Sequence, residues 1–134
     1  MSFSGDCVMS GIKYLLDTNF VLGMLKSSPG VLEVLASKQL TSQHCAYSAI
    51  TRMELLGFPG MTPAEEHLIR STLDQFRYLA ITGDVEDAAI RIRRTRRAKL
   101  PDALIAATAL CHSLELLTLD AGLQATFEAV RPPI

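Results

Sequence analysis

The sequence contains no tryptophan, no CxxC pair and no cluster of cysteine with histidine. Its three cysteines, Cys7, Cys45 and Cys111, are odd in number and scattered. This pattern argues against a disulfide framework or a zinc site and favours a reducing, cytoplasmic setting. No apolar run approaches the roughly 20 residues that span a bilayer, so we expect no membrane partner.

An excess of charge of one sign is also lacking, because the net charge is only −1. A protein whose whole surface bound nucleic acid would be strongly basic, so any such contact must come from a local patch. Apolar residues make up 49% and charged residues 20% of the 134 positions, as in ordinary globular proteins. We predict one domain over residues 12–134, after a flexible leader at 1–11 in which Met9 is an alternative start to Met1.

Short apolar segments alternate with segments of helical periodicity along the chain. Strands are predicted at 12–16, 43–47, 78–81 and 115–119, with a further strand near 127–130. Helices are predicted at 18–26, 29–38, 49–57, 63–76, 84–97, 101–113 and 123–127. Thr62 and Glu65 have the spacing of a capping box at the start of the fourth helix. Strands separated by helices imply an α/β fold of three layers, with a mostly parallel sheet of about five strands.

Four acidic residues lie where such a sheet places its ligand sites. Asp17 and Asp120 come at the carboxyl ends of predicted strands, and Asp102 lies in the first turn of the helix that Pro101 opens. Glu54 lies in the helix that follows the second strand. Parallel sheets bind ligands outside the carboxyl ends of their strands, so we predict that the four side chains converge there.

Three of these acids also have plainer explanations. Asp17 could cap a helix, Asp102 could complement a helix dipole and Asp120 could be a turn residue. Glu54 is harder to explain in this way, because its predicted helix face is otherwise apolar or small. A carboxylate buried on such a face requires a metal ion or a basic partner.

Clustered carboxylates suit Mg²⁺ or Mn²⁺, since these hard cations prefer oxygen ligands. Without metal the acids would repel one another, and some would be driven to protonate. With metal they could activate water and hold a phosphodiester for in-line attack. Asn19 and Thr118 flank the acids and are predicted to hydrogen-bond carboxylates or metal-bound water, although capping and strand propensity also explain them.

The only basic cluster in the sequence directly precedes Asp102. It consists of Arg91, Arg93, Arg94, Arg96, Arg97 and Lys99. A charge run is usually a solvated helix face, but the apolar positions of this predicted helix leave several of the arginines exposed together. We predict a phosphate track for RNA that includes Arg91, Arg94, Arg97 and Lys99.

Four segments, in order, resemble the motifs of PIN-domain proteins, and most closely those of the VapC toxins of toxin–antitoxin systems. They are LLDTNF at 15–20, SAITRMELLGF at 48–58, LPDALIAATAL at 100–110 and LLTLD at 116–120. The resemblance implies that Asp17, Glu54, Asp102 and Asp120 bind the metal, and that Asn19 and Thr118 order the metal site. Many relatives have a polar residue and then an aromatic one after the last acid, whereas this chain has Ala121-Gly122-Leu123.

The resemblance also implies an activity and partners. It predicts a Mg²⁺-dependent endoribonuclease, a homodimer, that cuts tRNA or ribosomal RNA and is neutralised by a small antitoxin. The groove between the helices around 21–35 and 64–76 is where it would place an antitoxin segment. The main alternative is a PIN-fold module without catalytic activity that acts only by binding protein or RNA.

Two other phosphate-handling folds fit the sequence less well. A response-regulator receiver domain needs paired acids after its first strand and a lysine after a late strand. Asp17 stands alone there, and no lysine follows Lys99. A haloacid-dehalogenase-type phosphatase needs Asp-x-Asp, but the sequence has Asp17-Thr18-Asn19.

Overall fold

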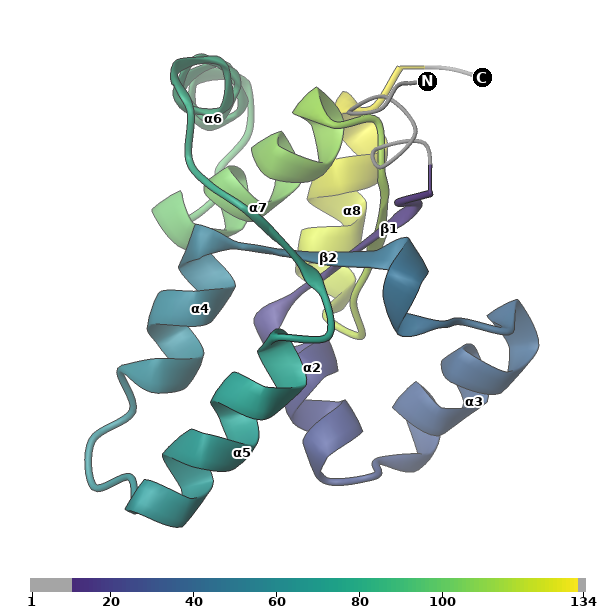
Figure 1. The fold of residues 1–134 in the computed structure, drawn as a ribbon. Coiled ribbons are helices and arrows are strands. Elements are labelled where there is room, and N and C mark those ends of the chain that lie inside the picture. Colours follow the sequence, from purple (N-terminus) through teal and green to yellow (C-terminus); the bar gives the residue numbers. More distant parts are fainter. Residues whose placement is uncertain (1–10, 133–134) are drawn as a thin grey trace, which may run out of the picture.

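The computed structural model describes residues 11–132 and shows a parallel sheet between two layers of helices (Figure 1). Four strands pair in the order β3-β2-β1-β4, and every pairing is parallel. They are β1 (Tyr14–Leu16), β2 (Cys45–Ser48), β3 (Arg77–Leu79) and β4 (Glu115–Leu117). The predicted leader lies, apart from Gly11, outside the described residues.

Helices occupy most of the remaining chain. They are α2 (Thr18–Leu25), α3 (Pro29–Lys38), α4 (Ala49–Leu56), α5 (Pro63–Leu73), α6 (Gly83–Thr95), α7 (Leu100–Cys111) and α8 (Ala121–Val130), with a 3₁₀ turn η1 (Ser42–His44) before β2. The predicted capping box of α5 is confirmed: the Thr62 hydroxyl accepts from the Glu65 N–H at 3.1 Å, and the Glu65 carboxylate accepts from the Thr62 N–H at 2.8 Å. Within residues 11–132 no single helix could cross a membrane by length and composition, although α2 and α3 pass that test as a pair bent by 99°.

The pleat of the strands divides the core into two apolar clusters. Leu15 and Leu116 face the layer formed by α6, α7 and α8. Their neighbours Leu16 and Leu117 face the opposite layer, which contains α2, α3 and α5. The predicted three-layer arrangement is therefore confirmed, since adjacent residues of one strand are buried on opposite faces.

The prediction of a fifth strand near 127–130 is wrong. In the described part of the chain the sheet has four strands, and α8 continues through this segment to Val130. Leu123 and Phe127 are buried four residues apart, and Val130 packs beside them, which is helical spacing. A short apolar run does not by itself distinguish a strand from the buried face of a helix.

The direction of strand order reverses at β1, and this reversal creates the switch point of the sheet. The chain proceeds from β1 to β2 and β3 on one side, and then crosses over to place β4 on the other side of β1. Leu16 pairs with Leu117, and the next backbone N–H, that of Asp17, donates to the Leu117 carbonyl at 3.2 Å. Open parallel sheets bind their ligands at such a point.

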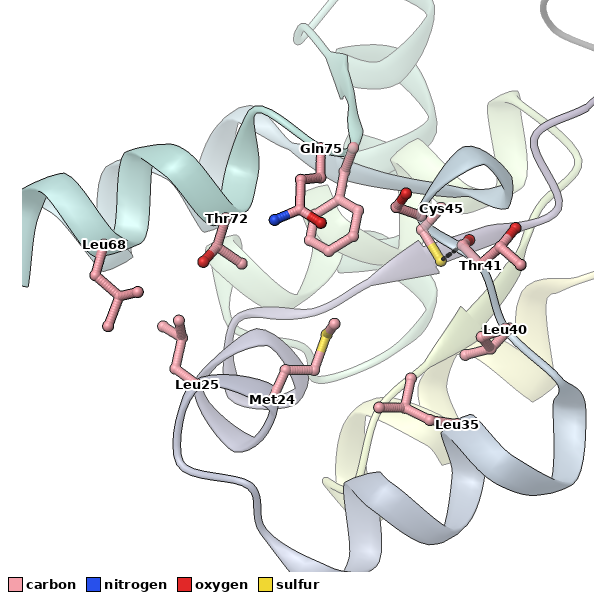
Figure 2. Close-up of a pocket in the computed structure, with 11 residues that line it drawn as sticks. Met24, Leu25, Leu35, Leu40, Thr41, Cys45, Leu68, Thr72 and Gln75 are labelled. Atoms are coloured by element: carbon pink, nitrogen blue, oxygen red, sulfur yellow. Dashed lines mark hydrogen bonds between the residues drawn. The ribbon is translucent and has the colours of Figure 1, made fainter.

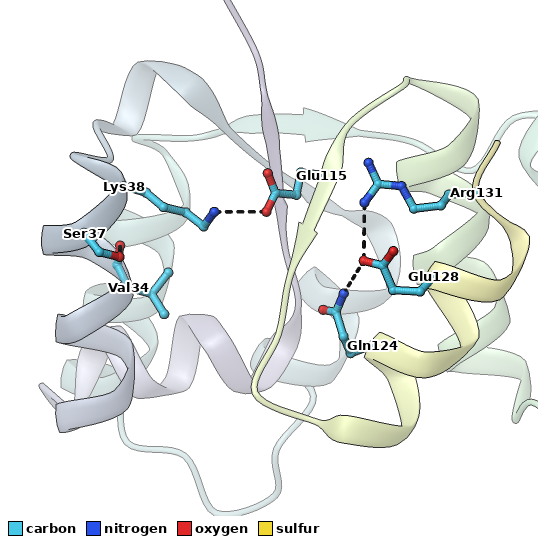
Figure 3. Close-up of polar contacts among 7 residues, drawn as sticks. All are labelled: Val34, Ser37, Lys38, Glu115, Gln124, Glu128 and Arg131. Carbon is cyan, nitrogen blue, oxygen red and sulfur yellow. Dashed lines mark hydrogen bonds and ion pairs between the residues drawn. The ribbon is translucent and has the colours of Figure 1, made fainter. Parts of the chain in front are cut away.

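Polar contacts fix the opposite, amino-terminal end of β4 (Figure 3). The Lys38 ammonium at the end of α3 lies 3.1 Å from the Glu115 carboxylate, while on α8 the Arg131 guanidinium lies 3.3 Å from the Glu128 carboxylate. Each pair is partly exposed, so each contributes at most about 1 kcal/mol. The first pair links α3 to the end of β4 that carries none of the four acids, and the second pair lies at the end of α8.

Candidate functional site

Asp17 is buried at the carboxyl end of β1, with only 3% of its surface exposed. Its Oδ1 accepts a hydrogen bond from the Phe20 N–H at 2.6 Å, which caps α2. Its Oδ2 accepts one from the Thr118 hydroxyl. Asp17 can therefore cap α2 and also belong to the candidate site, because Oδ1 accepts from the helix and Oδ2 accepts from the segment after β4.

Thr118 and Asp120 complete this side of the site. The Thr118 hydroxyl oxygen accepts from the Asp120 N–H at 2.9 Å while its proton goes to Asp17. Asp120 in turn caps α8, because its Oδ1 accepts from the Leu123 N–H at 3.0 Å. Thr118 thus joins the acid after β1 to the backbone of the acid that follows β4.

Glu54 reaches the site from α4, but not for the reason that its sequence pattern suggested. The prediction that its carboxylate lies buried on an apolar face is wrong, because Glu54 is exposed and its neighbour Met53 is 55% exposed. The buried face of α4 is formed instead by residues that include Thr51 and Leu55. The carboxylate is held by the Thr18 hydroxyl, which donates to Oε1 at 2.6 Å.

The charges of the four acids act on one another in part. Burial is the main cause that raises the pKa of Asp17, and the charges of Asp120 and Asp102 raise it further. Burial also raises the pKa of Asp102, with added contributions from Asp120 and Glu54. Lys99 acts in the opposite direction on Asp102. Acids from four separate segments therefore act on one another at one edge of the sheet, and their convergence on a metal ion stays a prediction.

The amino termini of three helices point at the same edge. Asp17 caps α2, Asp120 caps α8, and Asp102 lies in the first turn of α7. Helix amino termini carry partial positive charge and free N–H groups, which favour carboxylates and phosphates. Within residues 11–132 no group of three or more acidic, histidine or cysteine side chains is placed to hold a metal ion. The carboxylates at this edge are therefore not gathered into one ligand set.

Comparison with known proteins identifies the family. The PIN domain family matches residues 14–128, which is most of the chain. The chain belongs to the PIN domain family. Comparison with curated proteins finds no match.

Solved structures agree with this assignment of a PIN domain. A toxin–antitoxin complex from Klebsiella pneumoniae has 31% identity and a TM-score of 0.69, over 81% of this chain and 87% of that chain. FitAcB from Neisseria gonorrhoeae has 28% identity and a TM-score of 0.68, over 86% and 93%. DNA-bound VapBC from Salmonella typhimurium, at 19% identity, shares the fold with a TM-score of 0.72 over 90% and 96%.

The two other predicted site residues differ, because within residues 11–132 Thr118 hydrogen-bonds to an acid and Asn19 does not. Asn19 is exposed, and no hydrogen bond joins its amide to an acid in the described part of the chain. Thr18 and Thr51, which sequence reasoning missed, contact the site instead. The available signal was their position: Thr18 directly follows an acid, and Thr51 lies three residues before Glu54 on one helix.

The basic cluster is exposed throughout but is not one continuous helix face. Helix α6 ends at Thr95, so Arg96 and Arg97 lie in the linker to α7 rather than in the helix predicted to 97. Lys99 lies beside Asp102, on whose pKa its charge acts. Arg91 acts on Cys111 at the other end of α7, about 13 Å along the helix axis from Asp102.

A cavity of about 490 Å³ lies between α2, α3, α5 and the start of β2 (Figure 2). Its lining carries no charge: Met24, Leu25, Leu35, Leu40, Thr41, Ser42, Cys45, Leu68, Thr72, Gln75 and Phe76. Leu68 is 53% exposed at the rim. The cavity coincides with the groove predicted between the helices around 21–35 and 64–76.

Replacing the buried acid should stabilise the metal-free protein. Because the folded-state pKa of Asp17 lies above its ordinary value of 3.8, stability is full below that value and is lost as pH rises through the folded-state pKa. Asp17→Asn, which keeps a good capping residue, should therefore raise the unfolding midpoint at neutral pH and change it little below pH 3.8. Calorimetry in chelator checks this, and a variant less stable than wild type at neutral pH would contradict it.

Proposed function

We propose that this PIN domain is a metal-dependent endoribonuclease that acts as the toxin of a toxin–antitoxin pair. The observation that carries the proposal is that Asp17, Glu54, Asp102 and Asp120 lie along one edge of the sheet, where neighbouring acids raise the pKa values of Asp17 and Asp102. The similar structure from Klebsiella pneumoniae is a toxin–antitoxin complex, which supports the toxin role. The alternative of a PIN-fold binding module predicts no need for four acids at one point.

The donor set fits Mg²⁺ or Mn²⁺. All four side chains supply carboxylate oxygens, and burial and mutual repulsion hold the pKa values of Asp17 and Asp102 above their usual range. A divalent cation would relieve both effects. Mg²⁺ keeps several of its waters when bound, so an open arrangement of acids is compatible with it.

The chain's own residues would hold and orient the reacting groups. Asp17, Glu54, Asp102 and Asp120 would be the ligands, and Thr118 would fix the Asp17 carboxylate through its hydrogen bond. Bound Mg²⁺ would lower the pKa of a coordinated water and neutralise charge on the scissile phosphate. The amino termini of α2, α7 and α8 add partial positive charge at the same edge, which favours a phosphodiester. Asn19 remains a predicted contributor to this site.

The nuclease proposal is tested by incubating purified, antitoxin-free protein with total cellular RNA. We expect discrete fragments with Mg²⁺, none with chelator, and a loss of at least about a hundredfold in rate for Asp17→Asn, because the variant lacks a metal ligand. A preparation of Asp17→Asn made in the same way also controls for contaminating nucleases. If the folded protein, supplied with Mg²⁺, cleaves neither tRNA nor ribosomal RNA, the binding module is favoured.

The basic cluster is proposed as the RNA track that leads to the acids. Within residues 11–132 none of its arginines forms an ion pair with a carboxylate, so their charges stay available to phosphates. Lys99 connects the cluster to Asp102, since the two side chains interact electrostatically. Arg94, Arg97 and Lys99 are the strongest candidates, while Arg91 lies toward the far end of α7.

Removing two of these cations should weaken RNA binding in a salt-dependent way. In an Asp17→Asn background, Arg94→Gln with Arg97→Gln should lower RNA affinity most at low salt and reduce the slope of log affinity against log salt by roughly 0.7 per lost contact. The matched control is Arg131→Gln, since Arg131 lies at the end of α8, about 16 Å along the helix axis from Asp120. An unchanged slope in the double variant would contradict the proposal that these arginines bind RNA.

The uncharged cavity is proposed as the docking site of the antitoxin. Its lining of aliphatic, methionine and neutral polar side chains suits the apolar face of a short helix or extended segment. We also propose a homodimer in the reducing cytoplasm, where the free thiols Cys45 and Cys111 would stay reduced.

A charge placed at the cavity rim should break the antitoxin complex and spare the nuclease. Leu68→Glu buries a carboxylate against apolar groups on docking, so the co-encoded small protein should no longer copurify. Leu32→Glu is the matched control, since Leu32 is 45% exposed on α3 but does not line the cavity. Copurification that survives Leu68→Glu would place the antitoxin elsewhere.

A further inference from the structure

Glu54 is an exposed side chain whose carboxylate nevertheless accepts a hydrogen bond from another segment. Immobilising a glutamate costs rotamer freedom, because its side chain has several rotatable bonds. Within residues 11–132 the only hydrogen bond to its carboxylate comes from the Thr18 hydroxyl, at 2.6 Å. That distance is typical of a charge-assisted O–H···O⁻ bond, which is stronger than a neutral one. Glu54 therefore depends on Thr18 for its orientation.

Thr18 in turn depends on Thr51. The two hydroxyl oxygens lie 3.1 Å apart, and Thr51 is completely buried. Thr18 has a single hydroxyl proton, and the nearer, charged acceptor is Glu54. The Thr51 hydroxyl must then donate to the Thr18 oxygen, since a buried hydroxyl without a partner would be costly. The result is a directed chain from Thr51 to Thr18 to Glu54, in which each bond polarises the next.

We infer that Thr18 and Thr51 are positioning residues that hold the Glu54 carboxylate in register with Asp17. Thr18 directly follows Asp17, so the backbone that places one acid also places the hydroxyl that holds another. Thr51 lies on the face of α4 that packs into the core, three residues before Glu54. The hydroxyl pair therefore joins α2 to α4 at the point where both present an acid.

The inference rests on the proposed metal site, and its test measures metal binding apart from activity. Titration with Mn²⁺ should show affinity weakened by about tenfold in Thr18→Val, which keeps the side-chain volume but cannot donate to Glu54. Thr18→Ser keeps the hydroxyl and should restore most of the affinity. Thr51→Val should cause a smaller loss, since Thr18 can still donate.

The matched control is Thr108→Val. Thr108 is also buried, but its hydroxyl donates to the Leu104 carbonyl at 2.7 Å within α7. This variant loses a buried hydroxyl away from Glu54, so its Mn²⁺ affinity should equal that of wild type. Circular dichroism at the titration temperature verifies that each variant is folded.

A double-variant cycle with Glu54→Gln separates positioning from general damage. If Thr18 acts through Glu54, adding Thr18→Val to Glu54→Gln should cause little further loss of Mn²⁺ affinity. Wild-type Mn²⁺ affinity in Thr18→Val would overturn the role of the hydroxyl pair, and so would additive losses of affinity in the double variant. In either case Asp17→Asn should still abolish Mn²⁺ binding if the metal site itself exists. Absence of Mn²⁺ binding by wild-type protein would instead overturn the metal site, and the positioning role with it.

Discussion

The placement of β4 beside β1 is the constraint on which the candidate site depends. The pairing of Leu16 with Leu117 brings the residue after one strand next to the residue after the other, although about 100 positions separate them in sequence. The hydrogen bond from Thr118 to Asp17 follows from this register. The crossover through α6 and α7 also delivers Asp102 to the same edge, because α7 begins there before its chain returns into β4.

The acids of the candidate site lower the stability of the metal-free protein. A buried carboxylate with a raised pKa opposes folding at neutral pH, and the neighbouring charges of Asp102 and Asp120 add to that cost. The fold offsets the cost locally, because the Phe20 N–H and the Thr118 hydroxyl both donate to Asp17. The two clusters of buried apolar side chains stabilise the fold and offset the unfavourable free energy of the buried acid.

Local signals in the sequence were sufficient for the features that local physics determines. The capping box of Thr62 and Glu65, the layers of the fold and the strand-end position of Asp17 could all be predicted. The exposure of Glu54 could not be predicted, because packing against other segments, and not the periodicity of α4 itself, determines which face of this helix is buried. The helix at 127–130 was missed for a related reason, since a four-residue apolar run has no period of its own.

Thr18 and Thr51 stand beside predicted acids in the sequence, but their proposed roles also depend on the contact between α2 and α4, which the sequence alone does not show. Capping and catalytic explanations for Asp17 and Asp120 also turned out to be compatible rather than competing, since each carboxylate has two oxygens.

Anomalous scattering from a Mn²⁺-soaked crystal would test the central claim most directly. The account predicts a single cluster of Mn²⁺ density between Asp17, Glu54, Asp102 and Asp120, with the carboxylates facing it. Density elsewhere, or none at saturating Mn²⁺ with the four acids placed as described, would contradict a metal centre at the switch point.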